Sequence, residues 1–223
     1  MKGAAFGRQK TTALCLVALV AAVAALAGPV WAAPNLLANG DFELNPEGTT
    51  TPGGDFIAPN SIITGWRVFS VGAAGGKMTV TSAAGRSGKG VEIVRNNATG
   101  DTALDMDDPS VRVAIPAEQR IYKFTVDARD GSLFGTPNFV LGAQFQNLAF
   151  NRGMGFNPTA DWQTFGLTAK SDGNPGMGVR MDLGPAAGRS VNVDNARLVD
   201  ATLLVDRMIN GGFEGSTNGL PNW

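Results

Sequence analysis

The sequence predicts an all-β fold, an antiparallel β-sandwich, from three observations. Short segments alternate between apolar and polar residues, and clusters of Gly, Asn, Ser and Pro separate these segments. No stretch repeats its apolar residues with the 3.6-residue period of a long helix. A period of two turns one face of each strand toward a core and the other toward solvent, as in a sandwich of two sheets.

The elements follow from this alternation. The clearest strand covers 122–129, where Tyr122, Phe124, Val126 and Ala128 are predicted to face the core. The same period occurs in three further segments, namely 78–81, 139–143 and 191–194. Turn clusters lie at 45–48, 85–88, 97–100 and 171–175. Short strands at this spacing indicate a sandwich, and a jelly roll of two sheets is its expected form.

The first 32 residues have the order of a secretory signal peptide. Lys2, Arg8 and Lys10 precede an apolar run over 13–27, and small or aliphatic residues follow at the expected cleavage site after Ala32. A membrane anchor is the alternative, but the run is short for a bilayer that needs roughly 20 apolar residues. We therefore expect an exported protein, secreted or at the surface of a bacterial cell, with no membrane attachment after cleavage.

The composition of the expected mature chain excludes several classes of function. Loss of the leader leaves 15 basic against 19 acidic residues, a net charge of −4, which argues against a nucleic-acid partner and against an anionic membrane surface. The only cysteine, Cys15, lies in the leader, and the chain has no histidine. A zinc site is therefore nearly excluded, and so are Ser-His-Asp and Cys-His catalytic devices.

A motif near the expected mature N-terminus returns near the end of the chain. Asn-Gly-Asp-Phe-Glu at 39–43 corresponds to Asn-Gly-Gly-Phe-Glu at 210–214, and an aliphatic pair precedes each copy. The spacing is one domain length, not the period of a solenoid. We interpret 33–201 as one whole domain and 202–223 as the start of a second, truncated copy of it.

Four motifs in order resemble the family 4/9/22 carbohydrate-binding modules, which are galactose-binding-like jelly rolls. They lie at 35–43, 65–66, 161–165 and 191–195 and span nearly all of 35–200. The resemblance implies an exported, non-catalytic module that binds a polysaccharide such as β-glucan or xylan. Such modules are often appended to polysaccharide-degrading enzymes, so a glycoside hydrolase domain could follow Trp223.

A structural calcium ion is a further expectation. The family typically holds it by the Glu of the opening motif, a nearby carbonyl and the Asp of the closing strand, which here are Glu43, the Asp41 carbonyl and Asp194. An Asn-Gly turn favours a positive φ and can aim Asp41 and Glu43 at a shared point, with Phe42 plugging the core. Calcium prefers six to eight oxygen ligands of this kind. The alternative is that Glu43 and Asp194 pair with arginine or cap turns.

The predicted sugar site combines a polar stretch with phenylalanines. Sugar rings stack on exposed aromatic faces. The resemblance implies, however, that Trp66 and Trp162 pack in the core or brace a sheet edge, and Tyr122 falls on the apolar face of its strand. The candidate ligand-binding residues are Gln144, Gln146, Asn147 and Phe150, which the resemblance places where the family's concave-face strands touch the glycan, together with Asp105. Phe145 or Phe150 would supply the ring, and Asp105 and Asp107 would border the same groove. An ordinary solvated sheet is the alternative for the whole set.

Intrinsic catalysis is not expected of this chain. There is no nucleophile elbow and no glycine loop that would hold a phosphate. A glycosidase needs only two carboxylates, but no pair stands out among the acidic residues. Two non-catalytic functions remain open: a carbohydrate-binding module, and a structural or adhesive surface domain of the same fold without a glycan ligand.

Overall fold

A computed structural model describes residues 33–59, 61–97, 99–106, 108–132, 138–145, 152–184 and 188–202. The predicted signal peptide (1–32) and nearly all of the predicted second copy (202–223) lie outside these residues. Among the described residues, no helix is long and apolar enough to cross a membrane.

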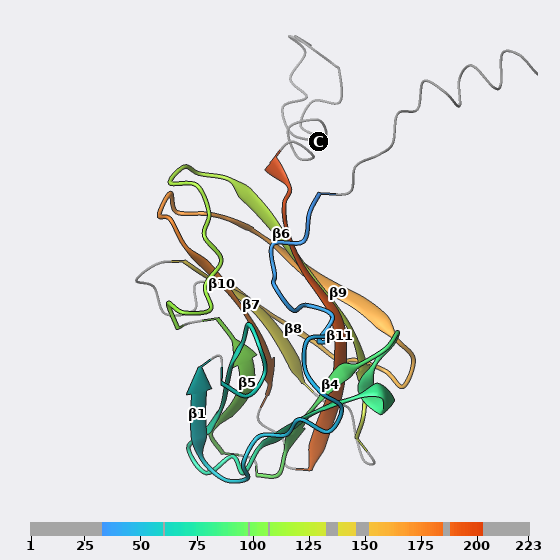
Figure 1. The fold of residues 1–223 in the computed structure, drawn as a ribbon. Helices are drawn as coiled ribbons and strands as arrows, with labels where there is room; N and C mark the ends of the chain where they lie inside the picture. The colour runs from blue at the N-terminus through green and yellow to red at the C-terminus, as the bar shows by residue number, and fades with distance from the viewer. Residues whose placement is uncertain are drawn as a thin grey trace, which may run out of the picture. The chain divides into compact units, whose positions relative to one another are not determined.

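The described chain is an antiparallel sandwich of two sheets (Figure 1). The six-stranded sheet has the order β1-β2-β5-β10-β7-β8, and the five-stranded sheet has the order β3-β4-β11-β6-β9. The strands are β1 (Phe56–Pro59), β2 (Arg67–Val71), β3 (Lys77–Thr81), β4 (Gly90–Arg95), β5 (Asp101–Asp105), β6 (Ile121–Asp130), β7 (Phe139–Phe145), β8 (Arg152–Phe156), β9 (Gln163–Lys170), β10 (Met177–Leu183) and β11 (Arg189–Asp200). One 3₁₀ turn, η1 (Ser82–Ala84), follows β3. The predicted β-sandwich is confirmed.

The core lies between the sheets, where the alternation placed it. Tyr122, Phe124, Val126 and Ala128 are all buried on the inner face of β6. The other predicted inward residues are buried as well, namely Met78, Val80, Phe139, Leu141, Ala143, Val191 and Val193. The two-residue period therefore predicted correctly which side of these strands faces the core, because each strand buries one side against the opposite sheet.

The N-terminal segment before β1 is held against β11 at an irregularity of that strand. The pairing of β11 with β6 shifts register between Asp194 and Arg197. Asn35 donates from Nδ2 to the Ala196 carbonyl at 3.0 Å and accepts the Leu198 N–H at Oδ1 at 3.0 Å. A bulge of this kind frees backbone groups, which here bind the incoming segment.

The opening motif turns differently from its prediction. Phe42 is fully buried, as expected, but the positive φ of the motif falls on Phe42 (57°) and not on Gly40. Gly40 is needed for another reason: the backbone of β11 passes so close to it that a Cβ there would lie 1.9 Å from the Ala196 carbonyl oxygen. The expectation of a positive φ at Asn-Gly was therefore wrong, since packing against β11 decides this turn.

Replacing Gly40 by Ala is expected to destabilise the domain by about 1–3 kcal/mol, because the added methyl group must displace the backbone of β11. Urea denaturation of both proteins measures the loss. Gly53→Ala is the matched control, because a Cβ at Gly53 meets no atom within 4 Å. Equal stabilities of the two variants would contradict the close approach.

Candidate functional site

The outer face of the six-stranded sheet carries a row of charged residues. Strand register aligns Arg67 with Asp105, Asp105 with Arg180, and Arg180 with Gly142. The next row contains Phe69, Ala103, Asp182 and Val140. The residues between these rows, such as Val68, Leu104 and Met181, face the core. We call the set Arg67, Phe69, Asp105, Arg180 and Asp182 the polar face.

Arg67 and Asp105 form a two-pronged ion pair across β2 and β5. Arg67 Nε lies 2.6 Å from Asp105 Oδ1, and Arg67 Nη2 lies 2.5 Å from Oδ2. The Asp105 side chain is 0% exposed, whereas that of Arg67 is 20% exposed. Two parallel hydrogen bonds hold the planar guanidinium group, so the ion pair fixes the Arg67 side chain in one orientation.

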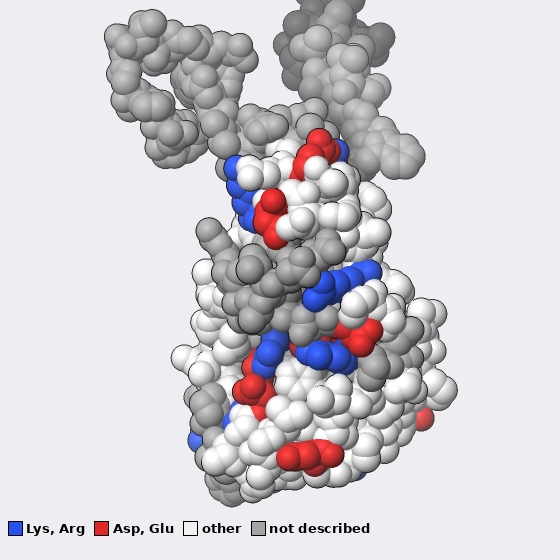
Figure 2. Space-filling model, turned by 90° about the vertical axis from the view of Figure 1, so that its left-hand side faces the viewer, with Lys and Arg blue, Asp and Glu red and all other residues white. Residues whose placement is uncertain are grey.

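Arg180 and Phe69 complete the centre of the polar face. The guanidinium carbons of Arg67 and Arg180 lie 5.1 Å and 5.0 Å from the centroid of the Phe69 ring, within the range of cation–π contacts. Arg180 Nη2 donates to Asp182 Oδ2 at 2.6 Å. Burial raises the pKa of Asp182, although Arg180 opposes this rise. In Figure 2, basic and acidic side chains gather in the middle of the side of the molecule that carries β1.

Glycines continue the two rows beyond Arg180 and Asp182. Arg180 aligns with Gly142, and Gly142 with Gly153 of β8, while Asp182 aligns with Val140 and then with Gly155. Gly153 and Gly155 of β8 are exposed, so the backbone of β8 is accessible there to a close neighbour, whereas Gly142 of β7 is buried. Glycine within a strand often marks such an approach.

The predicted sugar-binding residues are only partly described. Asp105 belongs to the polar face but is fully buried, so its oxygens hold Arg67. Gln144 lies on β7, with its backbone aligned with Gly178, and its side chain is outside the description. Gln146, Asn147 and Phe150 lie outside the described residues, as does Asp107.

Aromatic residues of the described chain offer no exposed stacking platform. Trp66 and Tyr122 are each 1% exposed, which confirms that they belong to the core. Trp162 is half-buried, with the Arg129 guanidinium carbon 4.9 Å from its ring centroid. Phe69 is 6% exposed beneath its two arginines.

Four residues of the polar face were not predicted from the sequence, namely Arg67, Phe69, Arg180 and Asp182. Alternation does place these residues outward, since Val68 and Met181 between them are apolar. Outward charged residues occur in the same sequence pattern on any strand that faces water, however. The pairing of β2, β5 and β10 cannot be read from any one stretch of sequence. The sequence signal that could have identified this face is Phe69, an aromatic residue at an outward position on the same side of the strand as Arg67.

The predicted calcium ligands surround the loop between η1 and β4. Asp194 Oδ2 accepts the N–H groups of Arg86 and Ser87 at 2.8 and 3.0 Å, and Glu43 Oε1 accepts that of Lys89 at 2.6 Å. Burial raises the pKa of Asp194, against the hydrogen bonds donated by Ser87, Asn195 and Arg86. The loop therefore binds both carboxylates through its backbone.

The carboxylates of Asp41, Glu43 and Asp194 each accept a backbone N–H group in the described arrangement. The Asp41 side chain is exposed and accepts the Glu43 N–H at 3.3 Å. Within the described ranges, no three Asp, Glu, His or Cys side chains gather as a metal-binding group. Calcium at these residues stays a prediction.

Known proteins resemble this chain in structure. No protein-family model matches it, and no curated protein matches its sequence. The carbohydrate-binding module TmCBM61, solved with β-1,4-galactotriose, is 16% identical over 75% of this chain and 99% of its own, with a TM-score of 0.51. The chain has the fold of a carbohydrate-binding module.

Two further solved modules are more distant in shape. A family 4 module is 18% identical over 74% of this chain and 99% of its own, with a TM-score of 0.46. The xylan-binding CBM22-1 domain of Xyn10C from Paenibacillus barcinonensis is 12% identical over 70% of this chain and 97% of its own, with a TM-score of 0.43. The predicted likeness of this chain to carbohydrate-binding modules is confirmed for the fold.

Proposed function

We propose that this domain is a non-catalytic module that binds a polysaccharide on the outer face of its six-stranded sheet. The observation that carries this proposal is the polar face, where two oriented guanidinium groups flank a buried ring beside the glycine positions of β7 and β8. A rigid sheet holds the whole set, so a ligand meets preorganised donors.

The chemistry of the polar face suits sugar hydroxyl groups. Guanidinium N–H groups donate to hydroxyl oxygens, and carboxylate oxygens accept from hydroxyl hydrogens. Asp182 Oδ1 is buried and has no hydrogen-bond partner in the described part of the chain. Such an atom is costly to leave unpaired, which marks Asp182 as a polar group that the described part of the chain leaves unsatisfied.

The remaining candidates extend this face along β7. Gln144, Gln146 and Asn147 would add planar amides, and Phe150 would supply a stacking ring. Because the described polar face offers no exposed ring, binding there depends on hydrogen bonds to hydroxyl groups. Candidate polysaccharides are β-glucan, xylan and β-1,4-galactan, the last because TmCBM61 was solved with β-1,4-galactotriose.

The leader supports export, so we place the module outside the cytoplasm, as part of a larger glycan-degrading or cell-surface protein. A catalytic partner domain would receive its substrate from the module. A structural or adhesive domain without a glycan ligand is the competing function, and retention on a panel of these polysaccharides separates the two. Retention on none of them by a folded domain would favour the competing function.

Replacing Arg180 by Gln is expected to weaken retention by about tenfold or more, because charged hydrogen bonds contribute about 1.5–3 kcal/mol. Affinity electrophoresis on the polysaccharide that retains the wild type measures the loss. Lys77→Gln removes the same charge from an exposed position on β3 and is the matched control. Unchanged retention by a folded Arg180→Gln domain would refute the placement of the site.

A further inference from the structure

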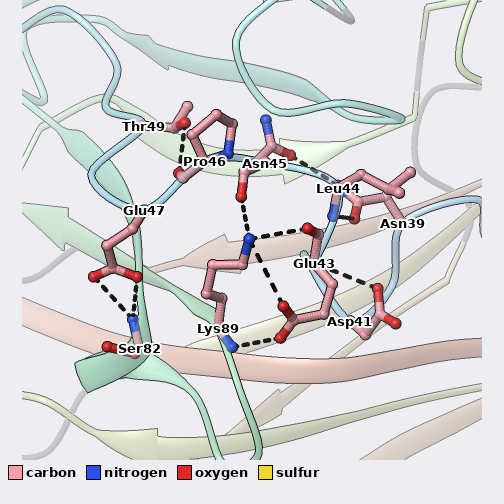
Figure 3. A network of polar contacts seen from close by, with 10 residues as sticks. All are labelled: Asn39, Asp41, Glu43, Leu44, Asn45, Pro46, Glu47, Thr49, Ser82 and Lys89. Carbon is pink, nitrogen blue, oxygen red and sulfur yellow. Dashed lines mark hydrogen bonds and ion pairs between the residues drawn. The ribbon is translucent and has the colours of Figure 1, made fainter.

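The ammonium group of Lys89 lies in a cage of oxygens at the site where the resemblance implies calcium. Lys89 Nζ donates to the Glu43 carbonyl at 2.9 Å and to the Asn45 carbonyl. The same nitrogen lies 3.7 Å from Glu43 Oε2. Figure 3 shows the Lys89 side chain directed into this turn, with its nitrogen among the three oxygens.

The number of oxygens matches an ammonium group. Lysine has three N–H donors and no acceptor, and three oxygens surround the Lys89 nitrogen. Calcium would need six to eight oxygens. The Lys89 side chain is 21% exposed, so its charge is largely withdrawn from water and requires these partners.

The carboxylate oxygens of Glu43 and Asp194 are already engaged. Glu43 Oε1 accepts the backbone N–H of Lys89, so one residue binds Glu43 through its backbone and its side chain. Asp194 is fully buried and accepts three backbone N–H groups, those of Arg86, Ser87 and Asn195. A calcium ion would have to displace these donors.

The loop that carries Lys89 is shaped for this contact. Gly88 has a φ of 79°, and a Cβ there would lie 2.1 Å from Glu43 Oε1. The backbone at Gly88 therefore passes directly over the carboxylate, which a side chain at this position would prevent. The loop and the opening motif are therefore in direct contact.

We propose that Lys89 replaces the structural calcium of related modules, and that its ammonium group is the cation that ties the opening motif to the loop before β4. The positive charge comes from within the chain, so the motif closes without metal. A divalent ion near Glu43 would also meet repulsion from Lys89. The domain accordingly keeps its stability where free calcium is scarce.

The test uses the full chain and thermal unfolding followed by circular dichroism. For the wild type, neither EDTA nor added calcium chloride should shift the melting temperature, because a ligand that binds only the native state would raise it. Isothermal titration with calcium chloride should show no saturable binding. A lower melting temperature in EDTA, or saturable binding of calcium, would overturn the proposal.

Lys89→Met removes the ammonium group and keeps the length of the side chain. We expect its melting temperature to fall by about 2–4 °C or more. Lys77→Met is the matched control and should leave the melting temperature unchanged. A Lys89→Met variant that melts with the wild type would show that the ammonium group is not needed, whatever the result with EDTA.

Discussion

Replacing Trp66 by Ala is expected to lower the free energy of unfolding by about 3–5 kcal/mol, the largest loss of any single change considered for this domain. The Trp66 ring is 1% exposed and lies 5.9 Å from the Phe42 ring, centroid to centroid. Its Nε1 donates to the Asn39 carbonyl at 3.0 Å. Truncation would leave a cavity and an unpaired carbonyl together.

The effect of this change should extend to the opening motif through Asn39. The Asn39 side chain donates to Asn45 Oδ1 and to the Thr64 carbonyl and accepts the N–H of Leu44. It therefore fixes the turn that carries Glu43. Loss of Trp66 should loosen this turn, and hydrogen exchange of the Leu44 amide should accelerate.

Urea denaturation followed by far-UV circular dichroism measures the loss without relying on tryptophan fluorescence. Trp162→Ala is the matched control, because Trp162 is only half-buried and its ring is covered by Arg129. The control should lose much less stability. If both variants lost the same amount, Trp66 would not be the anchor that the structure indicates.

Replacing Asp105 by Ala is expected to destabilise the domain by about 3 kcal/mol and to weaken glycan retention as well. Removing one partner of a buried ion pair leaves the other charge uncompensated, and such losses reach about 3–5 kcal/mol. Asp105 is fully buried beneath Arg67, and both prongs of the pair would be lost.

A double variant separates the structural role of this pair from its role in binding. Asp105→Leu combined with Arg67→Met replaces the ion pair by apolar side chains, which is often neutral for stability. The double variant should therefore recover much of the stability but none of the retention. Retention at the wild-type level in a stable double variant would remove Arg67 from the proposed site.

Glu118→Gln serves as the control for charge loss in the same denaturation series. Glu118 pairs with Arg120 at the surface, where its side chain is 57% exposed. Exposed pairs contribute little, so this variant should unfold within about 1 kcal/mol of the wild type. A loss as large as that of Asp105→Ala would show that burial does not explain the difference.

Local pattern was sufficient for β3, β6, β7 and β11 and for the side of each of these strands that faces the core. Tyr122, Phe124, Val126 and Ala128 were assigned to the core from their period alone, and all four are buried. A side chain on a strand has only two directions, and apolar surface prefers the one away from water. The burial of Trp66 likewise agreed with its predicted position.

The polar face required the tertiary structure, because its residues come together only through strand pairing. Arg67 and Asp105 are 38 residues apart in the chain, and Arg180 joins them by the register of β10 on β5. Strand order and register depend on the packing of the whole sandwich, which no local period encodes. The sequence does not distinguish an outward charged residue that faces water from one that pairs with another side chain.

The opening motif shows both sides of this division. The sequence by itself determined that Phe42 enters the core, and it predicted that Glu43 belongs to a shared polar site. Only the tertiary structure decided what meets Glu43 there, because Lys89 lies 46 residues away. The close approach of β11 to Gly40 likewise moved the positive φ to Phe42. Packing against β11 therefore outweighs the turn preference of the Asn-Gly pair at 39–40, because it restricts the backbone conformation of the motif.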